Sequence, residues 1–392
     1  MASPLEVDGE LVAVVREFAQ REVAPRVRDY DREEVLPRDL LEKMAALDFF
    51  GGTVPTEWGG AGLDHVTFVA MIEEMSRVDH NLGVLMSMPS GLVGSSILQY
   101  GSDEQKTRWL MPLARGKIFG AAGVTEPGSG TDVAGMQTTY KRDGDSYVIN
   151  GAKAWISNLD IASFFVTFAS MDRSLRHAGI TSFIIPADTP GVVTTPFKNK
   201  LGFRPLCTGE LVLQDVRVGA ECVLGNEGEG FAVAMTAVER GRLAVGARAV
   251  GLAQACLDDS IEYAKNRYAF GRPISEFQMV QKKIADMATG VASARLLVRH
   301  CAQVLDSGLR SRLETSMAKM YATDVALQAA TEAVQIHGAY GVSDECRAGR
   351  FYRDAKIFQI VEGVNDIHRV LIAKILLGLH GDSKRPFHGD GN

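Results

Sequence analysis

The sequence lacks several features that would place it in a familiar class of protein. It has no basic run or stripe and carries a formal net charge of −6, so no nucleic-acid partner is expected. No apolar stretch approaches the ~20 residues of a membrane span, so no membrane partner is expected either. The N-terminal residues lack the basic-then-apolar form of a signal peptide.

Cysteine and histidine are scarce and scattered. The five cysteines show no CxxC spacing or close pairing, a pattern that fits free thiols in a reducing cytoplasm and predicts neither a disulfide framework nor a zinc site. The histidines form no metal-ligand spacing, so we expect no catalytic metal. The remaining composition, 46% hydrophobic and 23% charged, is that of an ordinary globular protein, and 392 residues suggest two or three domains.

The chain changes texture twice, which predicts three domains: 1–118, 119–228 and 229–380, followed by a polar tail at 381–392. The first segment is helical, with apolar residues at helical spacing from Leu11 to Val23 and again from Val66 to Val78. Asp39 is the expected N-cap of another helix between these two.

The middle segment alternates short β-branched runs with turn residues. Asn150-Gly151 lies between two such runs, and this dipeptide predicts a tight hairpin turn. Further strands are expected at Thr181–Ile185 and Glu210–Leu213. The segment therefore reads as a β domain.

Long helical patterns return after Gly230. We expect helices at Phe231–Arg267, Gln278–Asp306, Leu313–Ile336 and Ile367–Leu377, the first ending near Gly271-Arg272-Pro273. Their apolar stripes suggest a helical bundle.

Four segments could carry chemistry, although each also has a structural interpretation. The loop Thr125–Asp132 offers backbone N–H groups and hydroxyls that can bind a flavin or a phosphate, or it is a polar turn. Trp155 can cover a flavin ring, or it packs in a core. Arg267 can hold a pyrophosphate, or it is a surface arginine at a helix end. Gly225–Gly230 is better explained as a turn than as a phosphate loop, because it lacks the Lys-Ser/Thr ending.

Five motifs, in order along the chain, resemble the acyl-CoA dehydrogenase family of flavoproteins over residues 8–380. They are Thr125–Asp132, Asn150–Asn158, Arg267–Pro273 with Gln278 following, Gln335–Gly341, and Glu362–Ile367. The resemblance implies a mostly α fold with a central β domain: an N-terminal helical domain, a middle β-barrel-like domain and a C-terminal four-helix bundle. It also implies a tetramer.

The resemblance further implies FAD as the cofactor and assigns residues to it. Segment 122–131 and the hairpin would contact the flavin half, with Ser157 near flavin N5, and Arg267, Gln278 and 335–339 would contact the ADP half of FAD in a neighbouring subunit. The residues assigned to the cofactor are Ala122, Val124, Thr125, Gly130, Thr131, Trp155, Ile156, Ser157, Arg267, Phe270, Gln278, Gln335, Ile336, Gly338, Ala339, Val364, Asn365 and Asp366.

By the same resemblance, Glu362 is the catalytic base that takes the α-proton of an acyl thioester. The backbone N–H of Glu362 and a ribityl hydroxyl would bind the thioester oxygen, and the β-hydrogen would leave as hydride. Some relatives carry the base at the position of Gly241, which is vacant here, and Glu239 would point to the opposite helix face. The residues assigned to substrate are Thr131, Glu239, Arg242 and Gly363.

Three residues depart from the family pattern. Val364 replaces a usual threonine and removes a hydroxyl near the flavin, and Ala339 replaces a glycine of the Gln335 motif. His337 takes a usually apolar position, where we expect packing rather than catalysis. None of these changes removes the base.

The leading hypothesis is therefore an FAD-dependent acyl-thioester dehydrogenase in the cytoplasm. The thioester could be carried by CoA or by an acyl carrier protein, and an electron-transferring flavoprotein would reoxidise the flavin. Leu92, Val93 and Ser96 suggest a short or modestly branched acyl chain. The alternatives are a flavin oxidase or monooxygenase on the same fold, or a non-catalytic acyl-binding, flavin-binding or nucleic-acid-associated protein; retention of Glu362 argues against the monooxygenase and the non-catalytic protein.

Overall fold

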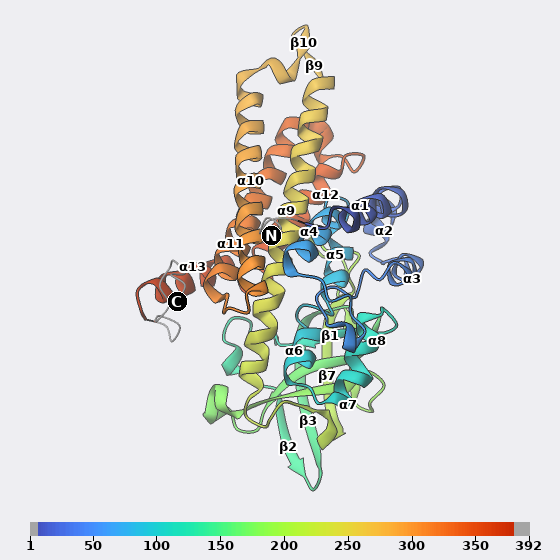
Figure 1. Ribbon diagram of the computed structural model, residues 1–392, viewed down its shortest axis with the longest axis vertical. Coiled ribbons are helices and arrows are strands. Elements are labelled where there is room, and N and C mark those ends of the chain that lie inside the picture. Colours follow the sequence, from blue (N-terminus) through green and yellow to red (C-terminus); the bar gives the residue numbers. More distant parts are fainter. Residues whose placement is uncertain (1–6, 380–392) are drawn as a thin grey trace. The chain divides into compact units, whose positions relative to one another are not determined.

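The computed structural model describes residues 7–379, so the predicted polar tail at 381–392 lies outside the described residues. The order of elements is helical, then mostly β, then helical again (Figure 1). Two compact units interleave along the chain. Unit 1 comprises the described parts of Met1–Ala24, His65–Gly83 and Arg242–Asn392, and unit 2 comprises Pro25–Asp64 and Val84–Gly241. The domain boundaries at 118, 228 and 380 stay a prediction.

Unit 2 contains a mixed β-sheet and short helices. Its helices are α2 (Val27–Glu33), α3 (Arg38–Ala46), α6 (Gly94–Tyr100), α7 (Asp103–Gln105) and α8 (Met111–Ala114), with the end of α5 (His80–Ser87) and the start of α9 (Gly230–Asn266). Its strands are β1 (Phe119–Gly123), β2 (Thr139–Asp143), β3 (Ser146–Ser157), β4 (Ala162–Ser170), β5 (Ile180–Pro186), β6 (Val192–Pro196), β7 (Thr208–Gly219) and β8 (Val223–Leu224).

The sheet of unit 2 runs in the order β6-β7-β3-β2-β4-β5-β8, with β1 paired to β4 in parallel. Within the described residues β6 and β8 do not pair with each other, so the sheet is not a closed barrel. Inward-facing side chains from β3, β4, β5 and β7, among them Ile149, Phe165, Phe183 and Leu211, form its core. Both strands predicted in this region, within β5 and β7, are confirmed.

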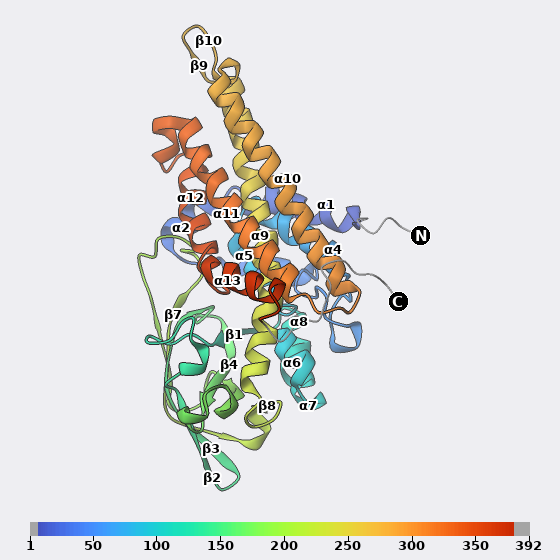
Figure 2. The same cartoon turned by 90° about the vertical axis from the view of Figure 1, so that its left-hand side faces the viewer.

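The hairpin predicted at Asn150-Gly151 is wrong, because both residues lie inside the continuous strand β3. The turn instead lies between β2 and β3, where Gly144 has a φ of +61° (Figure 2). Asn150 and Gly151 serve an irregularity in the β3–β7 pairing: the Asn150 side chain donates to Asp215 at 3.0 Å, and a Cβ on Gly151 would lie 2.4 Å from Thr138 Oγ1. Asn150-Gly151 therefore forms a β-bulge in β3 and not a hairpin turn.

The predicted N-cap of α3 is also wrong. The helix begins at Arg38 after Pro37, whose extended backbone starts the helix, and Asp39 lies in the first turn. The Asp39 carboxylate instead accepts a hydrogen bond from Arg26 at 2.6 Å.

Unit 1 is helical apart from one short hairpin. It contains α1 (Gly9–Phe18), α4 (His65–Ser76), the start of α5, most of α9, β9 (Tyr268–Ala269), β10 (Arg272–Pro273), α10 (Gln278–Asp306), α11 (Arg312–His337), α12 (Arg347–Phe358) and α13 (Asn365–Leu376). All four predicted C-terminal helices are confirmed within a few residues. Helices α9, α10 and α11 run side by side, and the β9–β10 hairpin joins α9 to α10 at one end (Figures 1 and 2).

Helix α12 was not predicted, because its buried face carries charges that interrupt the apolar pattern. Arg350 and Asp354 are 6% and 0% exposed, and Asp354 pairs with the buried His80 at 3.1 Å. Arg350 donates to the carbonyl of Val78 at 2.8 Å. From the sequence alone, such a helix face is predicted to be exposed to solvent, although in the structure it packs against other helices.

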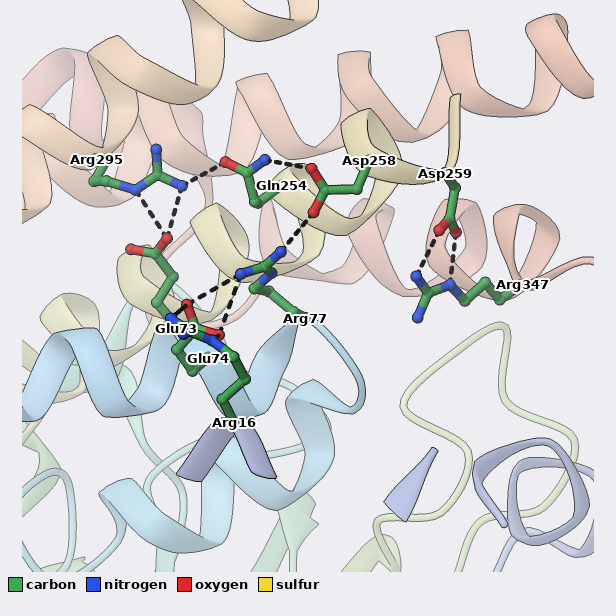
Figure 3. Close-up of polar contacts among 9 residues, drawn as sticks. All are labelled: Arg16, Glu73, Glu74, Arg77, Gln254, Asp258, Asp259, Arg295 and Arg347. Carbon is green, nitrogen blue, oxygen red and sulfur yellow. Dashed lines mark hydrogen bonds and ion pairs between the residues drawn. The ribbon is translucent and has the colours of Figure 1, made fainter. Parts of the chain in front are cut away.

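Ion pairs connect the helices of unit 1 (Figure 3). Arg77, just after α4, binds Glu74 at 3.1 Å and Asp258 of α9 at 2.7 Å. Arg295 of α10 donates to Glu73 at 2.8 Å. A shared network of this kind fixes the packing of helices more firmly than isolated surface pairs do. Arg16 and Gln254 complete this network, and Arg347 of α12 forms a separate pair with Asp259 of α9 at 2.5 Å.

Candidate functional site

The loop at 124–132 joins β1 to the rest of the sheet in unit 2. The Thr125 carbonyl accepts from the Ala154 N–H at 2.9 Å, which ties the loop to β3. Ala122, Val124 and Thr125 are half-buried, whereas Gly130 and Thr131 are exposed. A Cβ on Gly130 would meet nothing within 4 Å, so the surface of the loop is open.

A buried ion pair lies beneath this loop. Lys153 Nζ donates to Glu126 Oε1 at 2.8 Å, and the two side chains are 0% and 2% exposed. Glu126 also accepts from the backbone N–H groups of Gln137 and Thr138. Burial alone would raise the pKa of Glu126, but Lys153 and these N–H groups outweigh it and lower that pKa. The ionised carboxylate therefore anchors the loop to β3 and to the start of β2.

Trp155 lies in a second irregularity of β3, between Lys153 and Ile156. Its φ of +61° turns the indole outward, and the side chain is 64% exposed although its neighbours Ala154 and Ile156 are buried. The ring packs edge-on against Phe197 at 4.9 Å. Bulges commonly re-aim a side chain in this way near functional sites.

These features of unit 2 fit a flavin. An exposed indole offers an apolar face to a planar ring, and the open glycine loop offers N–H groups and hydroxyls to its polar edges. Ser157, at the end of β3, is half-buried, and its hydroxyl lies 3.4 Å from that of Thr208. The structure thus brings the end of β3 and the 124–132 loop together on one unit.

The second group of predicted residues lies in unit 1, in the turn between α12 and α13. Glu362 has a φ of +55° and Gly363 a φ of +91°, so two successive residues adopt the left-handed conformation. The Glu362 carbonyl accepts from Arg242 Nε at 3.2 Å and lies 3.3 Å from His368 Nε2. Lys319 Nζ donates to the Gly363 carbonyl at 2.7 Å.

The electrostatics of this turn suit a base. Burial raises the pKa of Glu362, and the nearby cations Arg248, Arg242 and Lys319 oppose the rise. Burial also lowers the pKa of Lys319 to about 7 and that of His368 to about 3, so His368 is neutral near pH 7. A carboxylate whose pKa is raised towards neutrality is a better proton acceptor than an ordinary surface glutamate.

The other residues predicted around this turn have different environments. Asn365 is buried and begins α13, Val364 is half-buried before it, and Asp366 is exposed. Glu239 lies three residues before Arg242 on α9 and is half-buried.

The residues predicted to contact the ADP half of FAD form a third group, in unit 1. Arg267 is exposed, with its guanidinium 5.8 Å from the Tyr340 ring, and both line a shallow pocket with Tyr263 and Asn266. The β9–β10 hairpin, which contains Phe270, lies at the end of the bundle away from α13 (Figure 1). The remaining members are Gln278 at the start of α10, Gln335 and Ile336 at the end of α11, and Gly338 and Ala339 directly after it.

His337 packs as predicted. It is 7% exposed, its Nδ1 lies 2.7 Å from the Ala333 carbonyl, and its ring stacks on Tyr263 at 4.3 Å. Burial alone would lower the pKa of His337, but contacts with Cys346 and Ala333 outweigh it and raise that pKa.

Sequence reasoning missed Lys319, Arg248 and His368. One signal was available for Lys319: it lies among Ala318, Ala322 and Thr323 on the buried face of α11, where a lysine needs a partner. Between residues 7 and 379, no three histidine, cysteine or acidic side chains gather in a way that could bind a metal. In the same range no helix combines the length and apolarity that crossing a bilayer requires.

Comparison with known proteins gives a consistent result along the whole chain. Residues 6–117 match the family model described as acyl-CoA dehydrogenase, N-terminal domain, 121–216 the middle domain, and 228–377 the C-terminal domain. The mitochondrial short-chain specific acyl-CoA dehydrogenase of Rattus norvegicus is 41% identical over 92% of this chain and 88% of its own length.

Two solved structures are also similar. Butyryl-CoA dehydrogenase from Megasphaera elsdenii is 36% identical with a TM-score of 0.92, covering 96% of this chain and 99% of that one. A glutaryl-CoA dehydrogenase from Mycobacterium smegmatis in complex with FADH2 is 30% identical with a TM-score of 0.90, covering 98% and 97%.

Proposed function

This chain belongs to the acyl-CoA dehydrogenase family, and from this membership we propose that it oxidises an acyl thioester to a trans-2-enoyl thioester. The observation that carries the proposal is the Glu362 turn. It presents a carboxylate of raised pKa among three cations, on a backbone whose carbonyls are held by side chains. Such a group can take a weakly acidic C–H proton.

Glu362 is the proposed catalytic base. The α-proton moves to its carboxylate, the Cα–Cβ double bond forms, and the β-hydrogen leaves with its electron pair. The Glu362 N–H would hold the thioester oxygen, where negative charge develops. Arg242 binds the Glu362 carbonyl and so holds the peptide that follows the base. Thr131, Glu239 and Gly363 complete the proposed substrate contacts.

The family implies a flavin cofactor, and we propose that it is FAD. When bound, the flavin supplies the acceptor for the hydride that leaves the β-carbon. The loop at 124–131 and the residues Trp155, Ile156 and Ser157 at the end of β3 would hold the ring system. Arg267, with Tyr340 and the end of α11, would hold the pyrophosphate and adenosine of a FAD bound mainly by a second copy of the chain.

A second copy is also supported by the apolar surface around the β9–β10 hairpin. Phe270 is 95% exposed, and Tyr268 and Met279 are each more than 60% exposed. A soluble monomer rarely leaves such a group uncovered, which supports the proposed tetramer. The remaining proposals are a short or modestly branched acyl group on CoA or a carrier protein, an electron-transferring flavoprotein as acceptor, and a cytoplasmic location.

The proposal is tested by mixing the holoenzyme anaerobically with short, branched and medium-length acyl-CoAs and following flavin absorbance. Bleaching by one class of thioester is the expected result. Glu362→Gln should keep its flavin and lose the bleaching by a factor of at least about 10³. Glu17→Gln, an exposed glutamate on α1, is the matched control and should behave as wild type.

Three outcomes would redirect the proposal. A flavoprotein that no CoA ester reduces, but that a carrier-protein thioester does, changes only the carrier. Reduced flavin that oxygen reoxidises within seconds, with hydrogen peroxide formed, indicates an oxidase on the same fold. A protein that binds no flavin when FAD is added refutes the assignment.

A further inference from the structure

Lys319 is an unusual residue for the middle of a helix in a bundle. It lies on α11, is 0% exposed, and its pKa is lowered to about 7 by burial. Burying an ammonium group is costly unless hydrogen bonds and charge compensate. The groups that Lys319 contacts therefore indicate which part of the structure its burial stabilises.

Both hydrogen-bond acceptors of the Lys319 ammonium lie in the segment that follows Glu362. Its Nζ donates to the Gly363 carbonyl at 2.7 Å and to Asn365 Oδ1 at 2.9 Å. The Asn365 side chain in turn donates to Thr323 at 2.9 Å and Asp324 at 2.8 Å on α11. Lys319 thus begins a chain of hydrogen bonds that fastens the start of α13 to α11.

This segment needs support because its backbone is strained. A non-glycine residue in the left-handed region is disfavoured by its own Cβ and persists where its surroundings hold it. Here Arg242 holds the carbonyl of Glu362, and Lys319 holds the next one. Two side chains from two different helices, α9 and α11, therefore fix two successive peptide planes.

The orientation of these peptides matters for the proposed reaction. The first plane carries the Glu362 carbonyl and the Gly363 N–H and is bonded to the Glu362 Cα, and the second carries the Gly363 carbonyl. A shift of either plane therefore displaces the Cα from which the Glu362 side chain and N–H project. A displacement of about 1 Å in a catalytic group can cost about 10²-fold in rate.

We propose that Lys319 is a positioning residue for the Glu362 base, holding the Glu362–Gly363 turn so that carboxylate and N–H face the thioester together. This role rests on the proposed function. Lys319 acts through Glu362 and makes no proposed contact with substrate. The charged and titratable groups that face Lys319 are Glu362, Arg242 of α9, Asp324 of α11 and His368 of α13.

The first test needs no substrate. Hydrogen exchange of the backbone amides in 360–366 is measured by mass spectrometry on wild-type holoenzyme, Lys319→Met and the control Lys282→Met. Lys282 is an exposed lysine on α10, paired with Asp286. Lys319→Met should exchange this segment at least about tenfold faster, with the β-sheet of unit 2 unchanged, and Lys282→Met should match wild type.

The second test separates the base from the hydride step. The CoA ester of 3,3-dimethylbutanoic acid has α-hydrogens but no β-hydrogen, so it can exchange α-protons with D2O but cannot reduce the flavin. Its α-exchange, followed by NMR, should fall about 10²-fold in Lys319→Met. With a reducing thioester, kcat should fall by a similar factor while KM and flavin content change less than about threefold.

Each result decides the proposal. Unchanged amide exchange together with kcat within twofold of wild type would overturn it. If wild type reacts with no thioester, the proposed function fails, and the amide exchange alone still decides whether Lys319 holds the turn. If Lys319→Met does not fold, Lys319→Gln, which keeps a donor but no charge, decides: slower α-exchange with normal flavin content supports the role, and wild-type behaviour refutes it.

Discussion

Replacing Lys153 by methionine tests the assignment of the buried ion pair beneath the 124–132 loop. The substitution keeps the length of the side chain and removes its charge. Glu126, 2% exposed at its side chain, would keep the N–H groups of Gln137 and Thr138 but lose the ammonium group that lies 2.8 Å away. A buried carboxylate without a countercharge must pay a desolvation penalty or take up a proton.

The expected loss of unfolding free energy follows from the burial and the remaining hydrogen bonds of Glu126. Removing one partner of a buried pair typically costs about 3–5 kcal/mol. The two remaining N–H bonds keep Glu126 partly satisfied, so we expect the lower end, about 3 kcal/mol. Unit 2 contains about 200 residues, for which 1 kcal/mol shifts Tm by about 2–4 °C. A drop of about 10 °C in the transition that melts the sheet is therefore expected.

The assay is thermal unfolding of the holoenzyme by circular dichroism, with flavin content measured in parallel. Glu126→Leu in the Lys153→Met background removes both charges, and it should recover at least half of the loss. Arg217→Met breaks an exposed pair with Asp143 and should change Tm by less than about 3 °C. A Tm of Lys153→Met within 2 °C of wild type would contradict the expected role of this ion pair. A double variant no more stable than Lys153→Met would contradict it too.

Three further predictions concern unit 1. Because burial raises the pKa of Glu362, the rate of flavin reduction in stopped-flow measurements should fall as the pH drops, with the fall centred above pH 4.5. Arg248→Met removes a cation that lowers this pKa, so the fall in rate should move to higher pH. Arg295→Met should cost about 1–3 kcal/mol in urea unfolding because it leaves Glu73, 12% exposed, without a 2.7 Å partner. Burial alone would raise the pKa of Cys346, but contact with His337 outweighs it and lowers that pKa, so iodoacetamide should alkylate this thiol below pH 8 faster than a free cysteine.

The sequence predicted the fold well wherever packing follows simple periodicity. The pattern from Gln278 to Asp306 gave the bounds of α10 because its apolar residues recur at helical spacing. It failed at α12, where Arg350 and Asp354 are buried in pairs that cannot be seen before the helices are packed. It failed at Asn150-Gly151 because Asn-Gly suits a bulge as well as a turn, and only the pairing of β3 with β7 distinguishes the two.

For the candidate site, the sequence located motifs but not the residues that hold them. Trp155 could be singled out, yet its exposure depends on an irregular register in β3. Lys319 and Gly363 are 44 residues apart, and nothing local to either predicts their contact. The role of a buried lysine can be inferred only when its hydrogen-bond acceptors are known, because a lysine at a solvent-facing helix position indicates no particular role.

The conformation of Glu362 explains why these distant contacts matter. Left-handed φ at a glutamate is disfavoured by its own Cβ, so local sequence alone would relax this turn towards a commoner geometry. The strain is retained because the carbonyls of Glu362 and Gly363 accept hydrogen bonds from Arg242 of α9 and Lys319 of α11. Those cations also oppose the rise in the pKa of the Glu362 carboxylate. The same side chains thus set both the orientation and the basicity of the proposed base, so substitutions at Arg242 or Lys319 should change both properties together.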